Sequence, residues 1–241
     1  MAEYIEPMLA TWVARLSRSA PSRCAVCGAW PAQPVCAACV ARFAQPQPRC
    51  RTCALPVPTG VERCGHCVRE VPPLDRCHAA VAYAYPWSGL LTHYKFGNAP
   101  GWAQVLAQLI KLDPAARDML AAAELVLPMP LSRERLAQRG FNQALQLARA
   151  LAAPKLRTDL LLRLRDTAPQ TALGRKQRAA NVRGAFGVEP LRAGELRGRH
   201  VLLVDDVMTS GASIFAAASA LRSAGCAAAS AMVVARTDEP D

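Results

Sequence analysis

Two adjacent aspartates and the hydroxyl-rich turn that follows them are the residues of this sequence with the clearest potential for chemistry. Asp205 and Asp206 come directly after four apolar residues, and residues 209–213 read Thr-Ser-Gly-Ala-Ser. Carboxylates at the carboxyl end of a strand can hold sugar hydroxyls or Mg²⁺. Hydroxyls and free backbone N–H groups at the start of a helix can hold a phosphate. The pattern therefore favours a site for a phosphorylated sugar.

The elements that must position these residues are readable on either side of them. Residues 201–204 are apolar β-formers, which predicts a buried parallel strand that Asp205 and Asp206 close. Residues 214–224 are rich in Ala and Leu and lack breakers, which predicts a helix. An ordinary strand and helix joined by an acidic N-cap would explain one aspartate, but not two followed by this turn. A P-loop NTPase is excluded because no G-x-x-x-x-G-K-[ST] occurs in the sequence.

Eight of the ten cysteines form four Cys-x-x-Cys pairs between residues 20 and 72. They are Cys24/Cys27, Cys36/Cys39, Cys50/Cys53 and Cys64/Cys67. Two such pairs complete a tetrahedral Zn²⁺ site, so the segment predicts two zinc ribbons with one structural zinc each. We expect the pairs to combine in sequence order, although the spacing alone also permits an interleaved arrangement. Cys77 and Cys226 fall outside both sets and fit buried thiols.

Length and composition fit one substantial domain with a small module beside it. The chain is 52% hydrophobic, but no apolar run reaches the roughly 18 residues of a membrane span. Its N-terminus carries Glu3 and Glu6 before any basic residue, unlike a secretory signal, so we expect a cytoplasmic protein with reduced thiols. The expected organisation is an N-terminal helix over 1–19, a double zinc ribbon over 20–72, and the sugar-phosphate domain over 75–241.

The net charge of +11 is concentrated in one part of the chain, because residues 131–200 hold 15 Lys or Arg against 5 Asp or Glu. Clustered positive charge indicates a polyanionic ligand: a pyrophosphate, a nucleic acid, or both. The alternative is a solvated surface in an Arg-rich chain. One set of candidate pyrophosphate ligands is Arg133, Arg135 and Arg139, in a loop that leads into a helix running to about residue 152. The others are Lys95, and Arg175 and Arg178 in a basic loop over 163–184.

The run over 201–213 resembles the phosphoribosyl-pyrophosphate (PRPP) loop of type I phosphoribosyltransferases. Further motifs occur in a fixed order: the cysteine pairs, Lys95-Phe96, Pro-x-Pro-Leu at 128–131, Arg-Gly-Phe-Asn-Gln at 139–143 and Asn-Val-Arg-Gly-Ala-Phe at 181–186. Together they resemble the ComF family over about residues 20–237. The resemblance implies an α/β fold of the type I phosphoribosyltransferase class, with a mainly parallel sheet, preceded by a double zinc ribbon.

The same resemblance implies a function and a set of site residues. It places Asp205 and Asp206 against the ribose, as the catalytic acids, and gives the 5′-phosphate to Thr209, Ser210, Gly211, Ala212 and Ser213. It implies PRPP with Mg²⁺ as ligand and a link to DNA uptake in natural competence. In such a phosphoribosyltransferase (a glycosyltransferase), pyrophosphate leaves C1 and a nucleophile attacks. The alternative is a non-catalytic protein that retains the PRPP pocket and binds single-stranded DNA or a competence helicase.

Overall fold

The computed structural model describes residues 22–165, 182 and 184–238. The chain divides into two compact units, Met1–Phe43 and Ala44–Asp241. The division falls between the two sets of cysteines, so it differs from the sequence-based boundary at residue 72. The helix expected over 1–19 lies outside the described residues, as do Arg175 and Arg178 of the basic loop.

In the first unit, a bridge between Ser22 and Ala32 encloses the first cysteine pair, with the Ser22 N–H donating to the Ala32 carbonyl at 2.9 Å. Helix α2 (Ala37–Phe43) begins directly after Cys36. It presents Cys39, which is buried. Two loops and one short helix thus bring four cysteines together in a segment with little other core.

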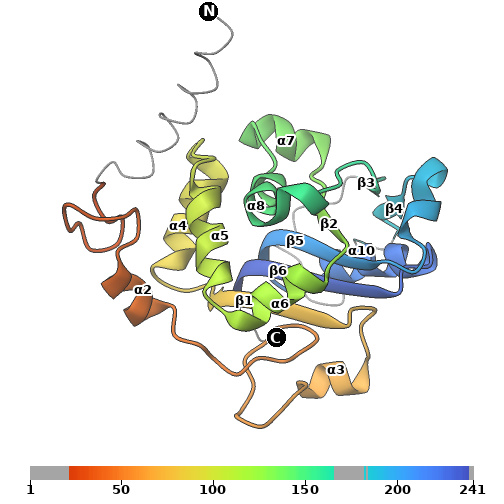
Figure 1. The fold of residues 1–241 in the computed structure, drawn as a ribbon, viewed down its shortest axis with the longest axis horizontal. Helices are drawn as coiled ribbons and strands as arrows, with labels where there is room; N and C mark the ends of the chain where they lie inside the picture. Colours follow the sequence, from red (N-terminus) through yellow and green to blue (C-terminus); the bar gives the residue numbers. More distant parts are fainter. Residues whose placement is uncertain (1–21, 166–181, 183, 239–241) are drawn as a thin grey trace, which may run out of the picture. The chain divides into compact units, whose positions relative to one another are not determined.

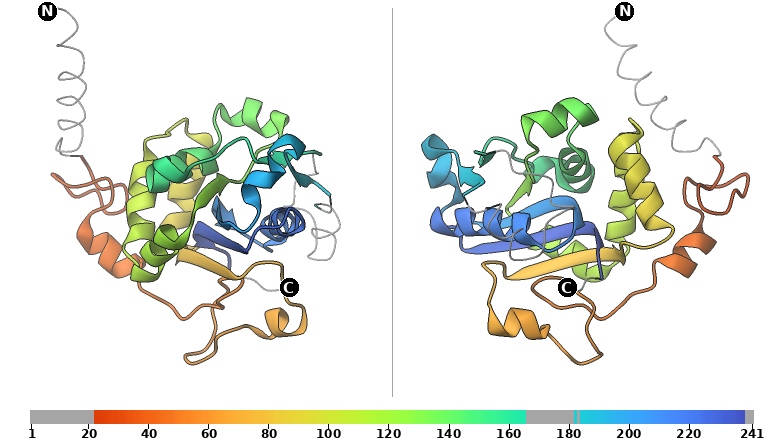
Figure 2. Two further views of the ribbon diagram at one scale, coloured as in Figure 1. Left: turned by 45° about the vertical axis from the view of Figure 1, so that its right-hand side comes forward. Right: turned by 180° about the vertical axis from the view of Figure 1, so that it is seen from behind.

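The second unit is built on four parallel strands in the order β1-β6-β5-β2. These are β1 (Arg76–Ala82), β6 (Ala228–Arg236), β5 (His200–Met208) and β2 (Leu125–Pro128). The two longest strands, β5 and β6, run side by side (Figure 2). The expectation that the aspartates close the strand was wrong, because Asp205, Val207 and Met208 still pair with β6. The strand therefore ends at Met208, immediately before the turn.

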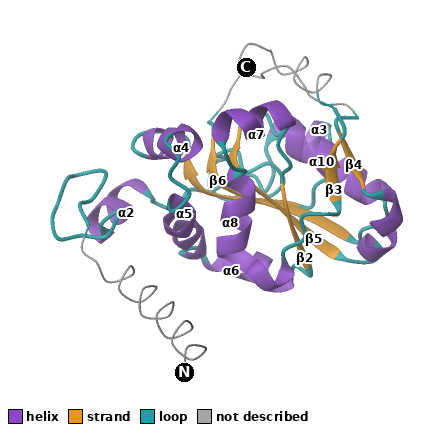
Figure 3. Cartoon of the chain, turned by 90° about the horizontal axis from the view of Figure 1, so that it is seen from above, coloured by secondary structure: helices purple, strands orange, loops and turns teal. Residues whose placement is uncertain are grey.

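Helices cover both faces of this sheet. Helices α5 (Trp102–Lys111) and α8 (Gln143–Ala152) pack against one face, and α10 (Ala212–Ser223) packs against the other (Figure 3). The remaining elements are α3 (Gly65–Arg69), α4 (Trp87–Phe96), α6 (Pro114–Ala122), α7 (Arg133–Arg139), the 3₁₀ turns Ala153–Lys155 and Pro190–Leu196, and the antiparallel pair β3 (Leu161–Arg163) and β4 (Phe186–Val188) (Figure 1). No helix in the described part of the chain has the length and apolar character that a membrane crossing requires.

The loop expected to carry Arg133, Arg135 and Arg139 forms the short helix α7, and the helix expected to follow it to about residue 152 is α8. Gly140 ends α7 with a φ of +75°, a left-handed conformation that glycine adopts without a steric penalty. Asn142 then caps α8, because its side chain accepts a hydrogen bond from the Leu145 N–H at 3.2 Å. This break turns the chain around the carboxyl end of β2.

The cysteines of the second unit belong to its hydrophobic core. Cys50, Cys53 and Cys67 lie in one buried cluster with Leu203 of β5 and Ile214 of α10. All three cysteines are at most 3% exposed. The cysteine segment of this unit therefore shares one hydrophobic core with β5 and α10.

Candidate functional site

A cavity of about 570 Å³ lies at the carboxyl ends of β2 and β5. Its walls include the aspartate pair, four of the five residues of the turn 209–213 (hereafter the hydroxyl turn), and several basic side chains. The basic residues that line it are Lys95, Arg135, Arg139 and Arg163. The structure thus brings together most of the site residues expected from the sequence.

The two aspartates differ in environment. Asp206 is 6% exposed, and its Oδ1 lies 3.1 Å from the Lys95 Nζ. Asp205 is half-buried, and its Oδ1 accepts a hydrogen bond from the Asp206 N–H at 2.9 Å. Burial and the neighbouring Asp206 carboxylate raise the pKa of Asp205 to about 7. In the absence of a ligand, the site therefore holds a carboxyl group that resists ionisation at neutral pH.

The hydroxyl turn depends on glycine at one position. Gly211 has a φ of +81°, and a Cβ there would lie 2.4 Å from the Met208 Cε. Helix α10 begins directly after it, at Ala212. Ser210 is 5% exposed and does not line the cavity. Its Oγ accepts a hydrogen bond from the Ala212 N–H at 3.4 Å. The other four residues of the turn face the cavity.

The three arginines expected to hold a pyrophosphate are not equivalent. Arg135 and Arg139 line the cavity, whereas Arg133 is exposed and lies outside its lining. The Arg139 guanidinium lies 5.2 Å from the ring centroid of Phe96 and donates to the Gln143 Oε1 at 3.0 Å. His93 and His200 are both exposed and line no part of the cavity.

The Arg-Gly-Phe-Asn-Gln motif holds the cavity wall together. Gln143 is 1% exposed, and its side-chain amide donates to the Lys95 carbonyl at 3.4 Å. The backbone carbonyl of Gln143 accepts a hydrogen bond from the Tyr94 hydroxyl at 2.8 Å. Asn142 donates to the Met129 carbonyl at 3.0 Å. The motif therefore links the end of α4, the end of β2 and the start of α8, and its arginine reaches the cavity.

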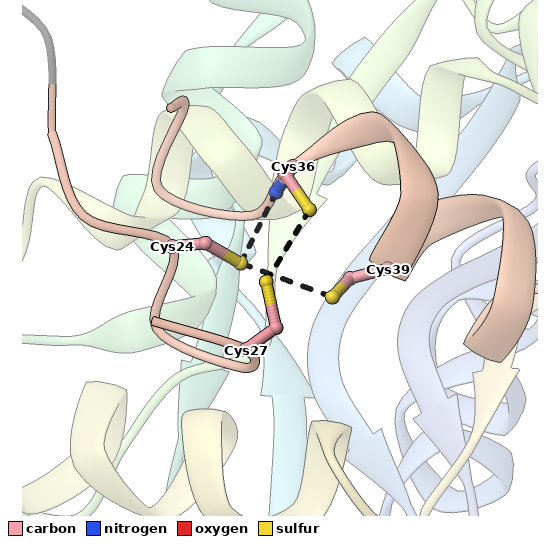
Figure 4. A group of neighbouring side chains, drawn as sticks. All are labelled: Cys24, Cys27, Cys36 and Cys39. Atoms are coloured by element: carbon pink, nitrogen blue, oxygen red, sulfur yellow. Dashed lines mark hydrogen bonds between the residues drawn. The ribbon is translucent and has the colours of Figure 1, made fainter. Parts of the chain in front are cut away.

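The first cysteine group consists of Cys24, Cys27, Cys36 and Cys39 (Figure 4). Its four Sγ atoms all lie within 4.8 Å of one another, with Cys24 to Cys39 at 3.9 Å and Cys27 to Cys36 at 3.7 Å. A tetrahedral ion with Zn–S bonds of about 2.3 Å needs Sγ atoms about 3.8 Å apart. The group can therefore hold a metal ion of this kind.

The second cysteine group consists of Cys50, Cys53, Cys64 and Cys67, which also lie within 4.8 Å of one another. The Cys53 and Cys64 Sγ atoms are 3.6 Å apart. Hydrogen bonds from the Cys53 and Cys67 thiols lower the pKa of Cys50, so this group favours at least one thiolate. In both groups, the pairs combine in sequence order and do not interleave.

Sequence reasoning missed a buried arginine beside the site. Arg236, the last residue of β6, is 1% exposed, and its guanidinium contacts the end of β5 and the second cysteine group. The available signal was a charged residue at the end of an otherwise apolar strand. Cys77 was expected as a buried thiol; it is 6% exposed, and burial raises its pKa to about 12.

Comparison with known proteins agrees with this geometry. Residues 136–240 match the phosphoribosyl transferase domain, so this part of the chain belongs to the phosphoribosyltransferase class. DNA utilization protein YhgH of Escherichia coli K12 is 29% identical over 209 residues, which cover 84% of this chain and 90% of that protein. YhgH of Salmonella typhi is 30% identical with the same coverage. Competence protein F of Haemophilus influenzae is 32% identical over 185 residues, which cover 74% of this chain and 80% of that protein. The chain belongs to the ComF family, as its motifs indicated.

Proposed function

We propose that this protein binds PRPP in the cavity of the second unit and acts as a phosphoribosyltransferase. The observation that carries the proposal is that three kinds of group meet around one cavity of about 570 Å³. They are the carboxylates Asp205 and Asp206, the hydroxyl turn, and the basic side chains Lys95, Arg135 and Arg139. A sugar that carries both a phosphate and a pyrophosphate needs all three kinds.

Each group has its own task in this proposal. The hydroxyl turn holds the 5′-phosphate through backbone N–H groups and hydroxyls at the start of α10. Asp205 and Asp206 hold the ribose hydroxyls, and their oxygens suit Mg²⁺, which when bound supplies positive charge next to the pyrophosphate. As the bond between C1 and the pyrophosphate oxygen breaks, Arg135 and Arg139 stabilise the negative charge on the leaving group. A nucleophile of the acceptor forms the new bond to C1.

Lys95 has two positions in this scheme. In the ligand-free protein it is held on Asp206 at 3.1 Å. A cation bound by Asp206 would compete for the same carboxylate and so release the ammonium group towards the pyrophosphate. Lys95 then adds to the positive charge of Arg135 and Arg139, which line the same cavity.

The decisive experiment measures binding and turnover with one set of proteins. Wild type, the double variant Asp205→Asn/Asp206→Asn and the exposed control Asp118→Asn are mixed with PRPP and Mg²⁺. A ligand that binds only the folded state raises the melting temperature, and we expect this for wild type and the control but not for the double variant. Pyrophosphate release is then followed with nitrogen nucleophiles as acceptors. An undiminished thermal shift in the double variant would place the ligand elsewhere.

We propose that both cysteine groups hold structural Zn²⁺. Thiolate groups in this spacing are typical zinc ligands, and segments with so little core of their own are stabilised mainly by the metal. Elemental analysis should find two zinc ions per chain. Since all ten cysteines are free in the structure, a reducing compartment such as the cytoplasm suits the protein.

We also propose single-stranded DNA and a competence helicase as partners. Residues 131–200, with 15 Lys or Arg against 5 Asp or Glu, supply charge for a phosphate backbone. The names of the relatives, competence protein F and DNA utilization protein, agree with a role in DNA uptake or use.

A further inference from the structure

One buried side chain connects the second cysteine group to the hydroxyl turn. The Arg236 Nε donates to the Cys53 carbonyl at 2.9 Å, and its Nη1 donates to the Met208 carbonyl at 3.2 Å. Nη1 also donates to the Thr237 carbonyl at 2.7 Å. Cys53 is a member of the second cysteine group, and Met208 is the last residue of β5 before the turn. A guanidinium therefore spans the distance between a metal site and a ligand site.

A second connection runs through Met208 itself, which is 2% exposed. The Cys77 Sγ lies 3.5 Å from the Met208 Sδ, and the Cys77 N–H donates to the carbonyl of Arg51, inside the first Cys-x-x-Cys turn of the group, at 2.7 Å. On its other side, the Met208 Cε occupies the space beside Gly211. A shift of the cysteine turn would therefore reach the hydroxyl turn through packed side chains.

Two guanidinium groups lie beside the second cysteine group. Arg49 donates to the carbonyl of Ala54, the residue after Cys53, at 3.0 Å, so two guanidinium groups bind adjacent carbonyls of one turn. The Arg49 Nη1 also lies 3.9 Å from the Asp238 Oδ1, so an exposed carboxylate offsets part of this positive charge. A divalent ion bound by four thiolates carries a formal charge of −2 and would offset both cations.

We propose that metal binding at the second cysteine group and ligand binding in the cavity are coupled, with Arg236 as the positioning residue that carries the coupling. The metal fixes the turn around Cys53, Arg236 and Met208 hold the end of β5 against that turn, and the hydroxyl turn is thereby held in its binding conformation. This inference rests on the proposed function, because it concerns the regulation of the same cavity. The first cysteine group is the natural control, since it belongs to the other compact unit.

The first test compares Cys64→Ser in the second cysteine group with Cys27→Ser in the first. Cys64 is half-buried and Cys27 is exposed, so neither substitution places a hydroxyl in a fully buried position. We expect each variant to lose one metal ion per chain. Only Cys64→Ser should speed amide hydrogen exchange at residues 209–213, by about tenfold or more, and weaken the affinity for PRPP with Mg²⁺ by about tenfold, which is about 1.4 kcal/mol. Exchange in α8 reports whether the unit is still folded. Equal effects of the two variants, or none from Cys64→Ser, would overturn the coupling.

The second test leaves every cysteine in place. Arg236→Lys keeps the positive charge but loses the planar guanidinium, whose Nε and Nη1 donate to the carbonyls of Cys53 and Met208. Because coupling between two binding sites is reciprocal, PRPP with Mg²⁺ should raise the affinity of the second group for zinc by the same factor in wild type. Competition with a chelator of known affinity measures this. We expect the enhancement to fall to less than twofold in Arg236→Lys, with two metal ions still bound; a full enhancement would contradict the role of Arg236.

The two proposals fail in different ways. If wild type shows no affinity for PRPP, the proposed function is wrong. Amide exchange at residues 209–213 in Cys64→Ser and Cys27→Ser needs no ligand, so it still decides whether the second cysteine group controls the hydroxyl turn.

Discussion

The raised pKa of Asp205 leads to a stability test of the site that requires no ligand. The folded protein holds the Asp205 proton with a pKa of about 7, whereas an unfolded chain holds it with a pKa of about 3.9. Since the folded state binds this proton more tightly, the contribution of Asp205 to stability is full below pH 4 and is lost as the pH rises to about 7 and above. Asn is isosteric and does not ionise, and its Oδ1 can still accept from the Asp206 N–H. Asp205→Asn should therefore stabilise the ligand-free protein at high pH.

The size of this effect follows from the two pH values chosen. Between pH 5.5 and the folded pKa of about 7, Asp205 is ionised in the unfolded chain but still protonated in the folded protein. This interval is about 1.5 pH units, and at about 1.36 kcal/mol per unit the wild type loses about 2 kcal/mol of folding stability across it. From there to pH 8.5 both states are ionised and little more is lost. For a chain of this length, that difference corresponds to a change of roughly 4 to 8 °C in melting temperature. The advantage of the variant over wild type should grow by this amount from pH 5.5 to pH 8.5.

Thermal melts of wild type and variant at each pH measure this directly, and any pH effect on metal binding is common to both proteins. Asp118→Asn is the control, because Asp118 is exposed on α6 and its substitution should leave the melting temperature unchanged at both pH values. The same Asp205→Asn protein should lose most of the thermal shift caused by PRPP with Mg²⁺. If the stability advantage of the variant over wild type did not grow between pH 5.5 and 8.5, the buried-carboxylate argument would be refuted.

Three further substitutions or titrations test other parts of the argument. Gly211→Ala should lower the melting temperature by several degrees and remove PRPP binding. A left-handed conformation costs other residues about 1–2 kcal/mol, and the new Cβ would meet Met208. Calorimetric melts with and without ligand measure both effects, and Gly194→Ala is the control because Gly194 has open space around it. Cys50→Ser/Cys53→Ser should lower bound zinc from two ions to one and lower the denaturant midpoint of the second unit. Cys24→Ser/Cys27→Ser should lower bound zinc equally but leave that midpoint unchanged, because its cysteines belong to the first unit. If both double variants lowered the midpoint of the second unit equally, the division into units would be contradicted. Affinity for single-stranded DNA should fall by about 0.7 log units per log of salt for each phosphate contacted, and Arg175→Ala/Lys176→Ala/Arg178→Ala should make the slope shallower; an unchanged slope would place the DNA elsewhere.

Much of the site was predictable because its signals are local. The apolar run before Asp205 and the Ala-rich segment after the turn predicted β5 and α10, and the position of the aspartates between them predicted a ligand at the carboxyl end of the sheet. The end of β5 was not predictable in the same way. Pairing with β6 extends the strand to Met208, and the sequence around Asp206 carries no trace of a partner strand about 30 residues away.

The parts that could not be predicted depend on contacts between distant residues. Arg236 hydrogen-bonds to the carbonyl of Cys53, 183 positions earlier in the chain, and a carbonyl has no sequence signature. The Cys-x-x-Cys spacing predicted two groups of ligands, but not that the second would lie in the core of the sheet domain. That outcome depends on which side chains line the buried faces of β6 and α10, and this is known only when the packed structure is known.

The composition of those faces gives a physical reason for a metal group inside this core. The residues of β6 and α10 that join the buried cluster include Ala217, Ala218, Ala229 and Ala231. Alanine buries little apolar surface, and each missing methylene forgoes about 0.8 kcal/mol of hydrophobic stabilisation. Small side chains let the helix and the sheet approach closely, but they contribute little hydrophobic stabilisation to the contact between them. In the proposal made above, a metal ion held by the four cysteines would supply stability in this core without adding bulk, and the cysteine segment would thereby support the ligand site.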